Sequence, residues 1–139
     1  MNELVYRNLS EDAKRQICAW KYGGEYDLYN LPAYEEMQVR QIGFMNPKSE
    51  KNYYGFWDES ILVGFVNILE EKEEVFIGIG VNPDFCNKHY GQRMLLITYE
   101  ISKKLYPNKP LYLEVRTWNI RAVKCYQKAG FRIDGQAYE

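Results

Sequence analysis

The feature that most constrains the fold is a change of hydrophobic period at Asn82-Pro83. Before this point lie three β-rich segments joined by short polar connections, which is typical of an antiparallel meander. These segments are 53–57, 61–69 and 75–81. After it, apolar residues recur with the period of an α-helix from Tyr90 to Leu105, and the pattern stops before Pro107. The sequence therefore predicts a sheet with this long amphipathic helix packed on it.

Flanking segments add further strands and helices. Ser10 is a good N-cap for a first helix, which Gly23-Gly24 is expected to end. Residues 25–31 lack clear periodicity, so we expect a loop there, and Pro32 can open a second helix over about 32–42. The remaining expected elements are strands over 4–7, 111–115 and 131–133, and a helix over 119–129 followed by Gly130. The predicted fold class is α/β (α+β), with a mixed, mostly antiparallel central sheet of about six strands flanked by about four helices.

Composition limits the classes of function. The 139 residues suit one compact domain spanning 1–139, and a net charge of -1 with 46% hydrophobic residues argues against disorder and against a basic nucleic-acid-binding protein. No stretch approaches the ~20 apolar residues of a membrane span, and a signal peptide is not evident, so we expect a cytoplasmic protein with no membrane partner. Three widely spaced cysteines and a single histidine predict neither a disulfide framework nor a metal site.

The segment between the third meander strand and the long helix has the features of an anion site. Backbone N–H groups delivered to a helix N-terminus bind phosphate well, because these donors are unpaired and the helix dipole is positive there. Lys88 and Arg93 add positive charge, and Gly91 allows a bulky anion to approach the backbone. An ordinary connection between a strand and a helix explains the same residues and stays open as the alternative.

Two glycines of the third meander strand need a separate explanation. Gly78 and Gly80 fail the dinucleotide-binding pattern, since they lie inside the strand and Pro83 takes the third glycine position. They indicate a bulge, or a close backbone approach such as a ligand lying along the strand.

A second segment, 119–131, predicts a short helix with a tyrosine on its inner face. Ala122, Tyr126 and Ala129 share that face, which directs Tyr126 toward the sheet between small neighbours. Its hydroxyl must find a partner. A hydrogen-bonded core tyrosine and a role in chemistry are the two explanations.

Together these segments resemble the two signature motifs of the GNAT superfamily of acetyl-CoA-dependent N-acetyltransferases, over Val75 to Phe131. The first is similar to the family pattern in part, because Cys86 replaces the usual Arg or Gln and His89 stands where glycine is usual. The second matches throughout. The aligned residues are Val81-x-Pro83, Cys86-x-x-His89-x-Gly91 and Leu95-Leu96 in the first motif, and Asn119-x-x-Ala122-x-x-x-Tyr126-x-x-x-Gly130-Phe131 in the second.

The resemblance implies a GNAT-like fold and direct attack of an unprotonated amine on the thioester of acetyl-CoA, without a metal. The pantetheine arm would lie along 79–81, where backbone N–H near Ile79 would stabilise the oxyanion. Tyr126 would be the catalytic residue, donating a hydrogen bond or proton to the departing thiolate. The residues implied in cofactor binding are Ile79, Gly80, Val81, Cys86, Asn87, Lys88, His89, Tyr90, Gly91, Gln92, Asn119 and Tyr126.

The base that accepts the proton of the amine is left unassigned. Glu74 is near the start of the third meander strand, but its parity relative to Val81 places it on the opposite face of the sheet unless a bulge near Gly78 shifts the register. A solvated hairpin carboxylate is the preferred explanation of Glu74, and a water chain would serve as the base equally well.

The acceptor is expected to bind beside the first helix, where Trp20, Tyr22, Tyr26 and Tyr29 gather. Residues 1–70 carry seven basic and eleven acidic side chains, a balance that suits a cationic amine through charge attraction and cation–π contacts. Core packing of these aromatic residues is the alternative. The predicted function is acetyl transfer to a small-molecule or peptidyl primary amine, and the alternative is a non-catalytic acyl-CoA-binding module with the same fold. Nucleic acid is not an expected partner, and a homodimer is left open.

Overall fold

The computed structural model of the chain describes residues 3–86, 88–115 and 119–132. In this part of the chain, five strands form one sheet in the order β1-β2-β3-β4-β5. Neighbouring strands are antiparallel except β4 and β5, which are parallel, so the predicted mixed, mostly antiparallel sheet is confirmed. The strands are β1 (Val5–Asn8), β2 (Tyr53–Asp58), β3 (Ile61–Glu70), β4 (Val75–Val81) and β5 (Leu111–Tyr112).

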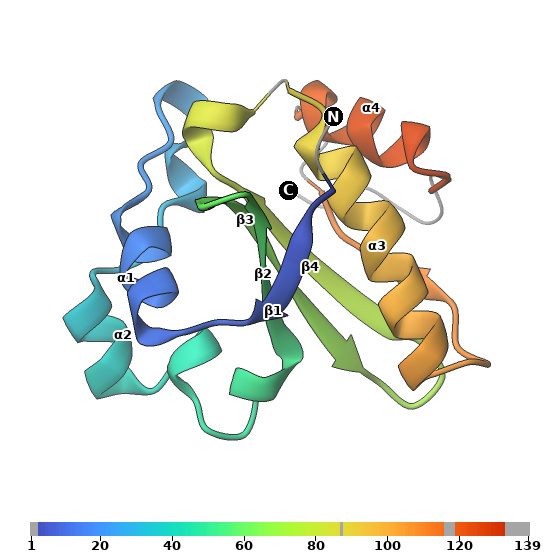
Figure 1. Cartoon of the computed structure of the whole chain (residues 1–139), viewed down its shortest axis with the longest axis horizontal. Helices are drawn as coiled ribbons and strands as arrows, with labels where there is room; N and C mark the ends of the chain where they lie inside the picture. The colour runs from blue at the N-terminus through green and yellow to red at the C-terminus, as the bar shows by residue number, and fades with distance from the viewer. Residues whose placement is uncertain (1–2, 87, 116–118, 133–139) are drawn as a thin grey trace.

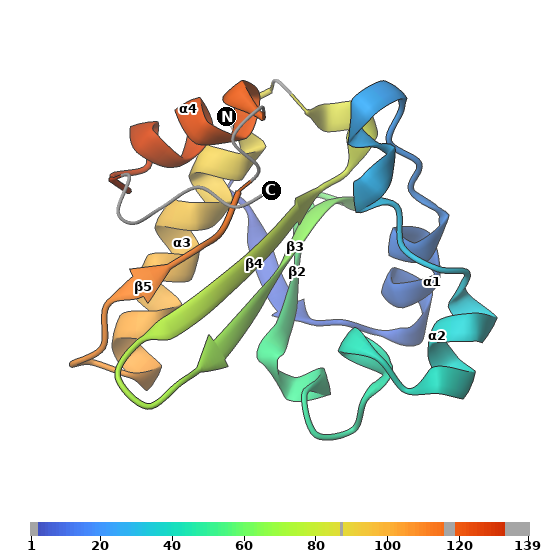
Figure 2. The same ribbon diagram turned by 180° about the vertical axis from the view of Figure 1, so that it is seen from behind.

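Helices cover both faces of this sheet, with α1 and α2 on one side and α3 and α4 on the other (Figures 1 and 2). The α-helices are α1 (Glu11–Ala19), α2 (Tyr34–Arg40), α3 (Tyr90–Leu105) and α4 (Ile120–Lys128). The 3-10 helices are η1 (Gly24–Tyr29), η2 (Gly43–Met45), η3 (Glu50–Asn52) and η4 (Pro83–Phe85). This arrangement agrees with the α/β class and with the about four flanking helices expected from the sequence.

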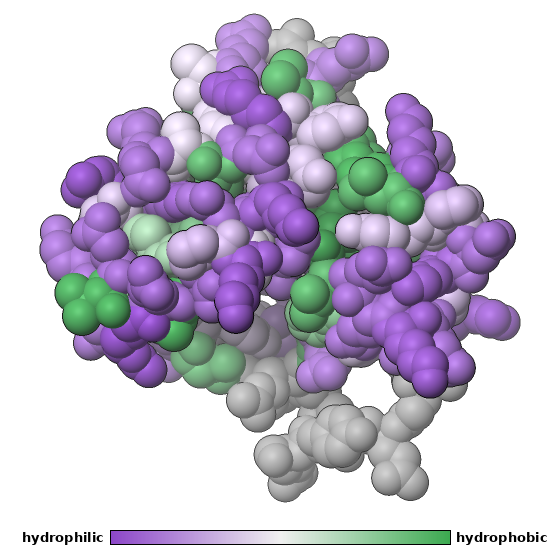
Figure 3. Space-filling model, turned by 90° about the horizontal axis from the view of Figure 1, so that it is seen from below, coloured by the Kyte–Doolittle hydropathy of each residue, from purple (hydrophilic) through white to green (hydrophobic). Residues whose placement is uncertain are grey.

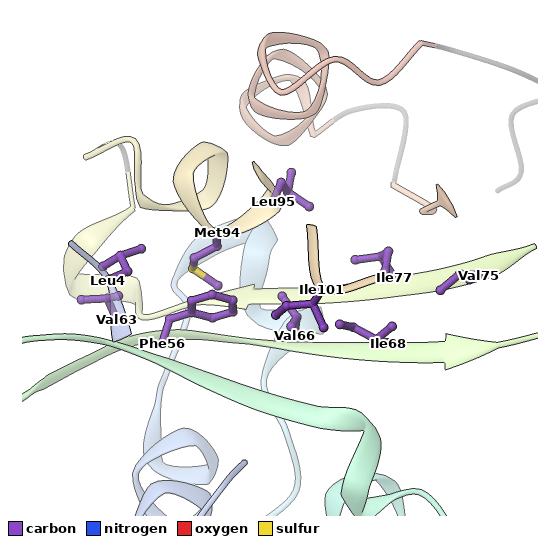
Figure 4. Packing of buried hydrophobic residues seen from close by; sticks show 10 residues of the cluster. All are labelled: Leu4, Phe56, Val63, Val66, Ile68, Val75, Ile77, Met94, Leu95 and Ile101. Carbon is purple, nitrogen blue, oxygen red and sulfur yellow. The ribbon is translucent and has the colours of Figure 1, made fainter. Parts of the chain in front are cut away.

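A separate hydrophobic core lies on each face of the sheet. On the α3 side, Met94 and Leu95 lie over buried sheet residues that include Phe56 and Ile77 (Figure 4). On the other side, α1, α2 and η2 cover the sheet with buried residues that include Ile17 and Phe44. The face of the molecule seen in Figure 3 is mostly hydrophilic, with apolar residues visible near its centre. The sheet is therefore a central layer, and the residues at the ends of its strands lie between the two helical layers.

The N-terminal helices differ in length from the sequence expectation. The Ser10 side chain accepts from the Ala13 N–H at 3.1 Å and caps α1 as predicted. The helix ends at Ala19 and not at Gly23-Gly24, because Trp20 leaves the helical conformation and packs its ring against Phe65. The expected loop over 25–31 largely forms η1, and α2 begins at Tyr34, two residues after Pro32.

One of the two alternatives for Gly78 is excluded, and two expectations about the strands are wrong. The β3–β4 register is unbroken, so no bulge lies near Gly78; the irregularity is between β2 and β3, where Val63 is the extra residue between the partners of Phe56 and Trp57. The strand expected over 111–115 is limited to β5. Phe131 and Arg132, expected to start a sixth strand, are not in one, and position 133 lies outside the described residues.

Candidate active site

β4 is paired with β3 along its whole length but with β5 only at its first two residues, Val75 and Phe76. Two hydrogen bonds fix which way its backbone groups point. The Val75 N–H donates to the Pro110 carbonyl on the β5 side, whereas the N–H of Asn82, just after the strand, donates to Val63 on the β3 side. Because successive residues of a strand direct their backbone groups to opposite sides, odd-numbered residues of β4 face away from β3.

Ile79 and Val81 therefore direct their backbone N–H and C=O groups away from β3, on the side of β4 where β5 pairs only with Val75 and Phe76. Within the described part of the chain, no strand pairs with them there. The Val81 carbonyl accepts a hydrogen bond from the Tyr22 hydroxyl at 2.6 Å. The amide of Val81 and both backbone groups of Ile79 are thus positioned to pair with an extended ligand, as the sequence predicts for 79–81.

The N-terminus of α3 lies directly after this strand end and has no capping side chain. His89 occupies the cap position in the left-handed conformation, with φ 65°. Glycine is usual at this position of the GNAT motif, and histidine adopts the conformation at some energetic cost. The Arg93 amide bonds the His89 carbonyl, so the amides of Tyr90, Gly91 and Gln92 precede the helical ladder. Three amide donors at the positive end of a 16-residue helix are suited to binding an anion, and the phosphate site expected here stays a prediction.

The remaining residues of the predicted phosphate turn have different roles. Lys88 is exposed beside the helix end, and Asn87 lies outside the described residues. The Cys86 thiol lies 3.7 Å from the Asn82 carbonyl, and burial raises its pKa, so the thiol is neutral and adds no negative charge to the anion site.

Two glycines also serve packing within the protein. A Cβ at Gly91 would lie 3.0 Å from Cys125 Sγ, so the missing side chain permits the close contact between α3 and α4. A Cβ at Gly80 would lie 2.4 Å from the Phe65 ring, its cross-strand neighbour. Gly80 therefore gives room to an aromatic ring of β3. A Cβ at Gly78 would have only ordinary contact distances to other protein atoms.

Asn119 and Tyr126 of the second motif lie on the helix that follows β5. The Asn119 side chain accepts from the Ala122 N–H at 3.2 Å as an N-cap, and its amide group donates to the Tyr29 hydroxyl at 3.1 Å. Tyr126 is partly buried against the core on the α3 side. Burial, with smaller contributions from Cys125 and Tyr29, raises the pKa of Tyr126. Its phenol is therefore protonated at any physiological pH and acts as a hydrogen-bond donor.

The predicted acceptor residues form an aromatic cluster beside α4, with the exception of Trp20. Tyr29 packs edge-on against Tyr22 and is stacked with Tyr26, with ring centroids 6.4 and 6.5 Å apart. The face of Tyr26 also carries the Arg121 guanidinium, whose Cζ lies 4.2 Å from the ring centroid. Trp20 packs on the core of the α1 side. Tyr29 is thus the cluster member that touches Asn119 directly, while Tyr22 binds the end of β4.

Two residues near the site do not stand out in the sequence. Arg121 lies in the first turn of α4, where a cation interacts unfavourably with the helix dipole. A basic residue at this unfavourable position is the sequence signal that could have indicated a role for Arg121. Asp58, at the end of β2, accepts a hydrogen bond from the Tyr90 hydroxyl at 2.6 Å. Nothing local in the sequence around Asp58 indicates this contact.

In the described part of the chain, no helix has the length and apolar character needed to cross a membrane. In the same residues, no three His, Cys, Asp or Glu side chains are grouped as metal ligands.

Comparison with known proteins agrees with this geometry. The chain is 31% identical over 99 residues to a probable spermine N(1)-acetyltransferase of Bacillus subtilis subsp. natto (strain BEST195), a match that spans 63% of this chain and 65% of that protein. A chimera of the spermidine N-acetyltransferase SpeG from Vibrio cholerae and hSSAT has the same fold, with a TM-score of 0.79 and 20% identity over 96% of this chain and 83% of that one. An acetyltransferase (GNAT family) from Bacillus anthracis has a TM-score of 0.77 and 19% identity over 96% and 82%.

At such identities the solved structures establish the fold alone. The sequence pattern of the acetyltransferase (GNAT) family, in contrast, matches residues 9–131, which include the open edge of β4, the uncapped start of α3 and the Tyr126 helix. The chain therefore belongs to the acetyltransferase (GNAT) family.

Proposed function

We propose that this protein, acting as one catalytic domain, transfers the acetyl group of acetyl-CoA to a primary amine. The observation that carries the proposal is the meeting of two backbone features: the unpaired edge of β4 at Ile79 and Val81, and the uncapped N-terminus of α3 at Tyr90. The first suits an extended amide-containing arm and the second suits a diphosphate. Coenzyme A contains both.

The proposed roles follow from these positions. The amides at the start of α3, with Lys88, bind the pyrophosphate, and Asn119 contacts the pantetheine arm. When bound, acetyl-CoA supplies an activated acyl group. The N–H groups of Ile79 and Val81, which face away from β3, are the candidates to stabilise the negative charge that develops on the acetyl oxygen.

Tyr126 is the proposed donor to the sulfur that leaves. Burial raises the pKa of its phenol, which makes full proton transfer to a thiolate less favourable than in water and makes a hydrogen bond the main contribution. Glu74 is exposed in the hairpin at the opposite end of β4, roughly 20 Å along the strand from Val81 at about 3.3 Å per residue. It is too distant to accept the proton of the amine, so we propose that solvent accepts it.

For the acceptor we propose a small cationic amine of the polyamine class. Two of the relatives named above, the Bacillus subtilis protein and the Vibrio cholerae chimera, are named for action on spermine and spermidine. In this chain, Glu25 and Asp27 are exposed on η1 beside Tyr29, and their charges suit a second cationic group of the acceptor. The Arg121 guanidinium lies over the Tyr26 ring, so a ring of this cluster already accepts a cation, and we propose that the substrate amine makes the same kind of contact in the cluster. A cytoplasmic location stays a prediction.

The test is calorimetric titration with coenzyme A, followed by measurement of free-thiol release from acetyl-CoA with spermine, spermidine, a monoamine and a peptide amine. We expect binding and a higher kcat/KM for the polyamines. Binding without thiol release on any amine would support the non-catalytic module and contradict the proposal.

A further inference from the structure

The first residue of α3 is held in place by a side chain from another part of the sheet. The Tyr90 hydroxyl donates to Asp58 Oδ2 at 2.6 Å, and Asp58 is the last residue of β2. A hydrogen bond to a carboxylate is shorter and stronger than one between neutral groups. It also raises the pKa of Tyr90, so the phenol keeps its proton and the bond persists across the physiological pH range.

The Tyr90 ring also closes the base of the turn that precedes the helix. Phe85, the last residue of η4, packs edge-on against it, with ring centroids 5.9 Å apart at 89°. Both rings pack against the core on the α3 side. Phe85 before the turn and Tyr90 after it are therefore in contact, and Asp58 holds the hydroxyl end of the Tyr90 side chain.

A carboxylate that faced a diphosphate directly would be electrostatically unfavourable. Here the phenol ring lies between the carboxylate and the backbone of α3, so the charge is used in a hydrogen bond at a distance from the free amides. Donors that are fixed before the ligand arrives bind it more tightly, because the ordering cost is met on folding.

We infer that Asp58 is a positioning residue for the cofactor: through Tyr90 it fixes the first turn of α3 so that the amides of Tyr90, Gly91 and Gln92 converge on the pyrophosphate of coenzyme A. The inference rests on the proposed function. Asp58 touches neither the cofactor nor the reacting atoms and acts only through Tyr90.

The test measures affinity for coenzyme A in single and double variants. Tyr90→Phe and Asp58→Ala should each raise the Kd of coenzyme A and the KM of acetyl-CoA by about tenfold, with kcat at saturation unchanged. Asp58→Asn keeps an acceptor oxygen for the phenol and should recover most of the affinity. The double variant Asp58→Ala with Tyr90→Phe should bind coenzyme A no more weakly than either single variant, because each substitution removes the same hydrogen bond.

Two controls separate positioning from general destabilisation. Tyr99→Phe removes a hydroxyl from an exposed tyrosine of the same helix and should leave the Kd of coenzyme A unchanged. Pantetheine, which lacks the pyrophosphate, should bind Tyr90→Phe and the unmodified protein equally well. Equal losses for pantetheine and coenzyme A, additive losses in the double variant, or an unchanged Kd in Tyr90→Phe would overturn the inference. Failure of the unmodified protein to bind coenzyme A would instead contradict the proposed function.

Discussion

The two ends of β4 are built differently. At its start, the strand pairs with β5, and polar contacts close the hairpin beside it: Lys109 Nζ lies 2.7 Å from Glu70 Oε2, and the Tyr112 hydroxyl donates to Glu71 at 2.9 Å. At its end, β5 has separated and the backbone of Val81 faces the Tyr22 hydroxyl. β4 thus has a paired edge at its start, which supports the fold, and an unpaired edge at its end, which is open to a ligand.

Burial follows the same division. Val75 and Ile77 are fully buried, whereas Ile79 and Val81 are only partly buried against the same core. The difference teaches that stability and binding are separable along this strand. Loss of a buried side chain at the closed end should affect the free energy of unfolding, and loss of a group that faces the ligand at the open end should affect catalysis.

The largest effect on stability is expected from Ile77→Ala at the closed end. Ile77 is 1% exposed, and removing a buried branched side chain costs about 2–5 kcal/mol, since it leaves a cavity. Urea unfolding measures the loss, and kcat below the unfolding transition should be unaltered. A loss under about 1 kcal/mol would show that the closed end is not the stable part of the strand.

At the open end, Tyr126→Phe should lower kcat on the order of 10²-fold by removing the donor to the leaving sulfur. The ring still packs against the core, so urea unfolding should give nearly the same free energy as for the unmodified protein. Since burial raises the pKa of this phenol, kcat in the unmodified protein should show no loss from Tyr126 ionisation up to about pH 10. An unchanged kcat in the variant would remove Tyr126 from the mechanism.

A matched pair of glycines sharpens the comparison within β4. Gly80→Ala should destabilise the fold by about 1–3 kcal/mol, because its Cβ would meet a Phe65 ring that is itself packed against Trp20, Phe44 and Tyr53. Gly78→Ala meets only ordinary contact distances and should change stability by less than about 0.5 kcal/mol. Equal effects in thermal or urea unfolding would contradict the packing role assigned to Gly80.

The smallest effect concerns the pH dependence of the closed end. The hydrogen bond to Glu71 raises the pKa of Tyr112 to about 12, from the usual 10.0. A pKa raised by folding means that the associated stability is complete below pH 10 and is lost as the pH rises toward about 12. The difference in unfolding free energy between the unmodified protein and Tyr112→Phe should therefore shrink over that range. A constant difference would show that the hydrogen bond does not contribute.

Local sequence patterns predicted the parts of the molecule that depend on near neighbours in the chain. The meander, α3 and the cap at Ser10 follow from periodicity and from hydrogen bonds within one turn. The second motif also identified the helix of Tyr126. These features need no knowledge of what packs against them.

Other features depend on contacts between distant residues and could not be predicted in this way. The end of α1 depends on where Trp20 meets Phe65, and the role of Gly80 depends on the same ring across the sheet. The bulge at Val63 arises from the pairing of β2 with β3. Asp58 and Tyr90 are 32 positions apart, and the β5 partner of β4 is shorter than its hydrophobic pattern indicates.

The central claim is that coenzyme A binds at the open end of β4 and the start of α3. Amide hydrogen exchange resolved by residue, with and without coenzyme A, tests this most directly. The account predicts slower exchange at Ile79, Val81 and Tyr90–Gln92 and no change at Val75 or in the 71–74 hairpin. Protection at the hairpin end, or none at the start of α3, would contradict it.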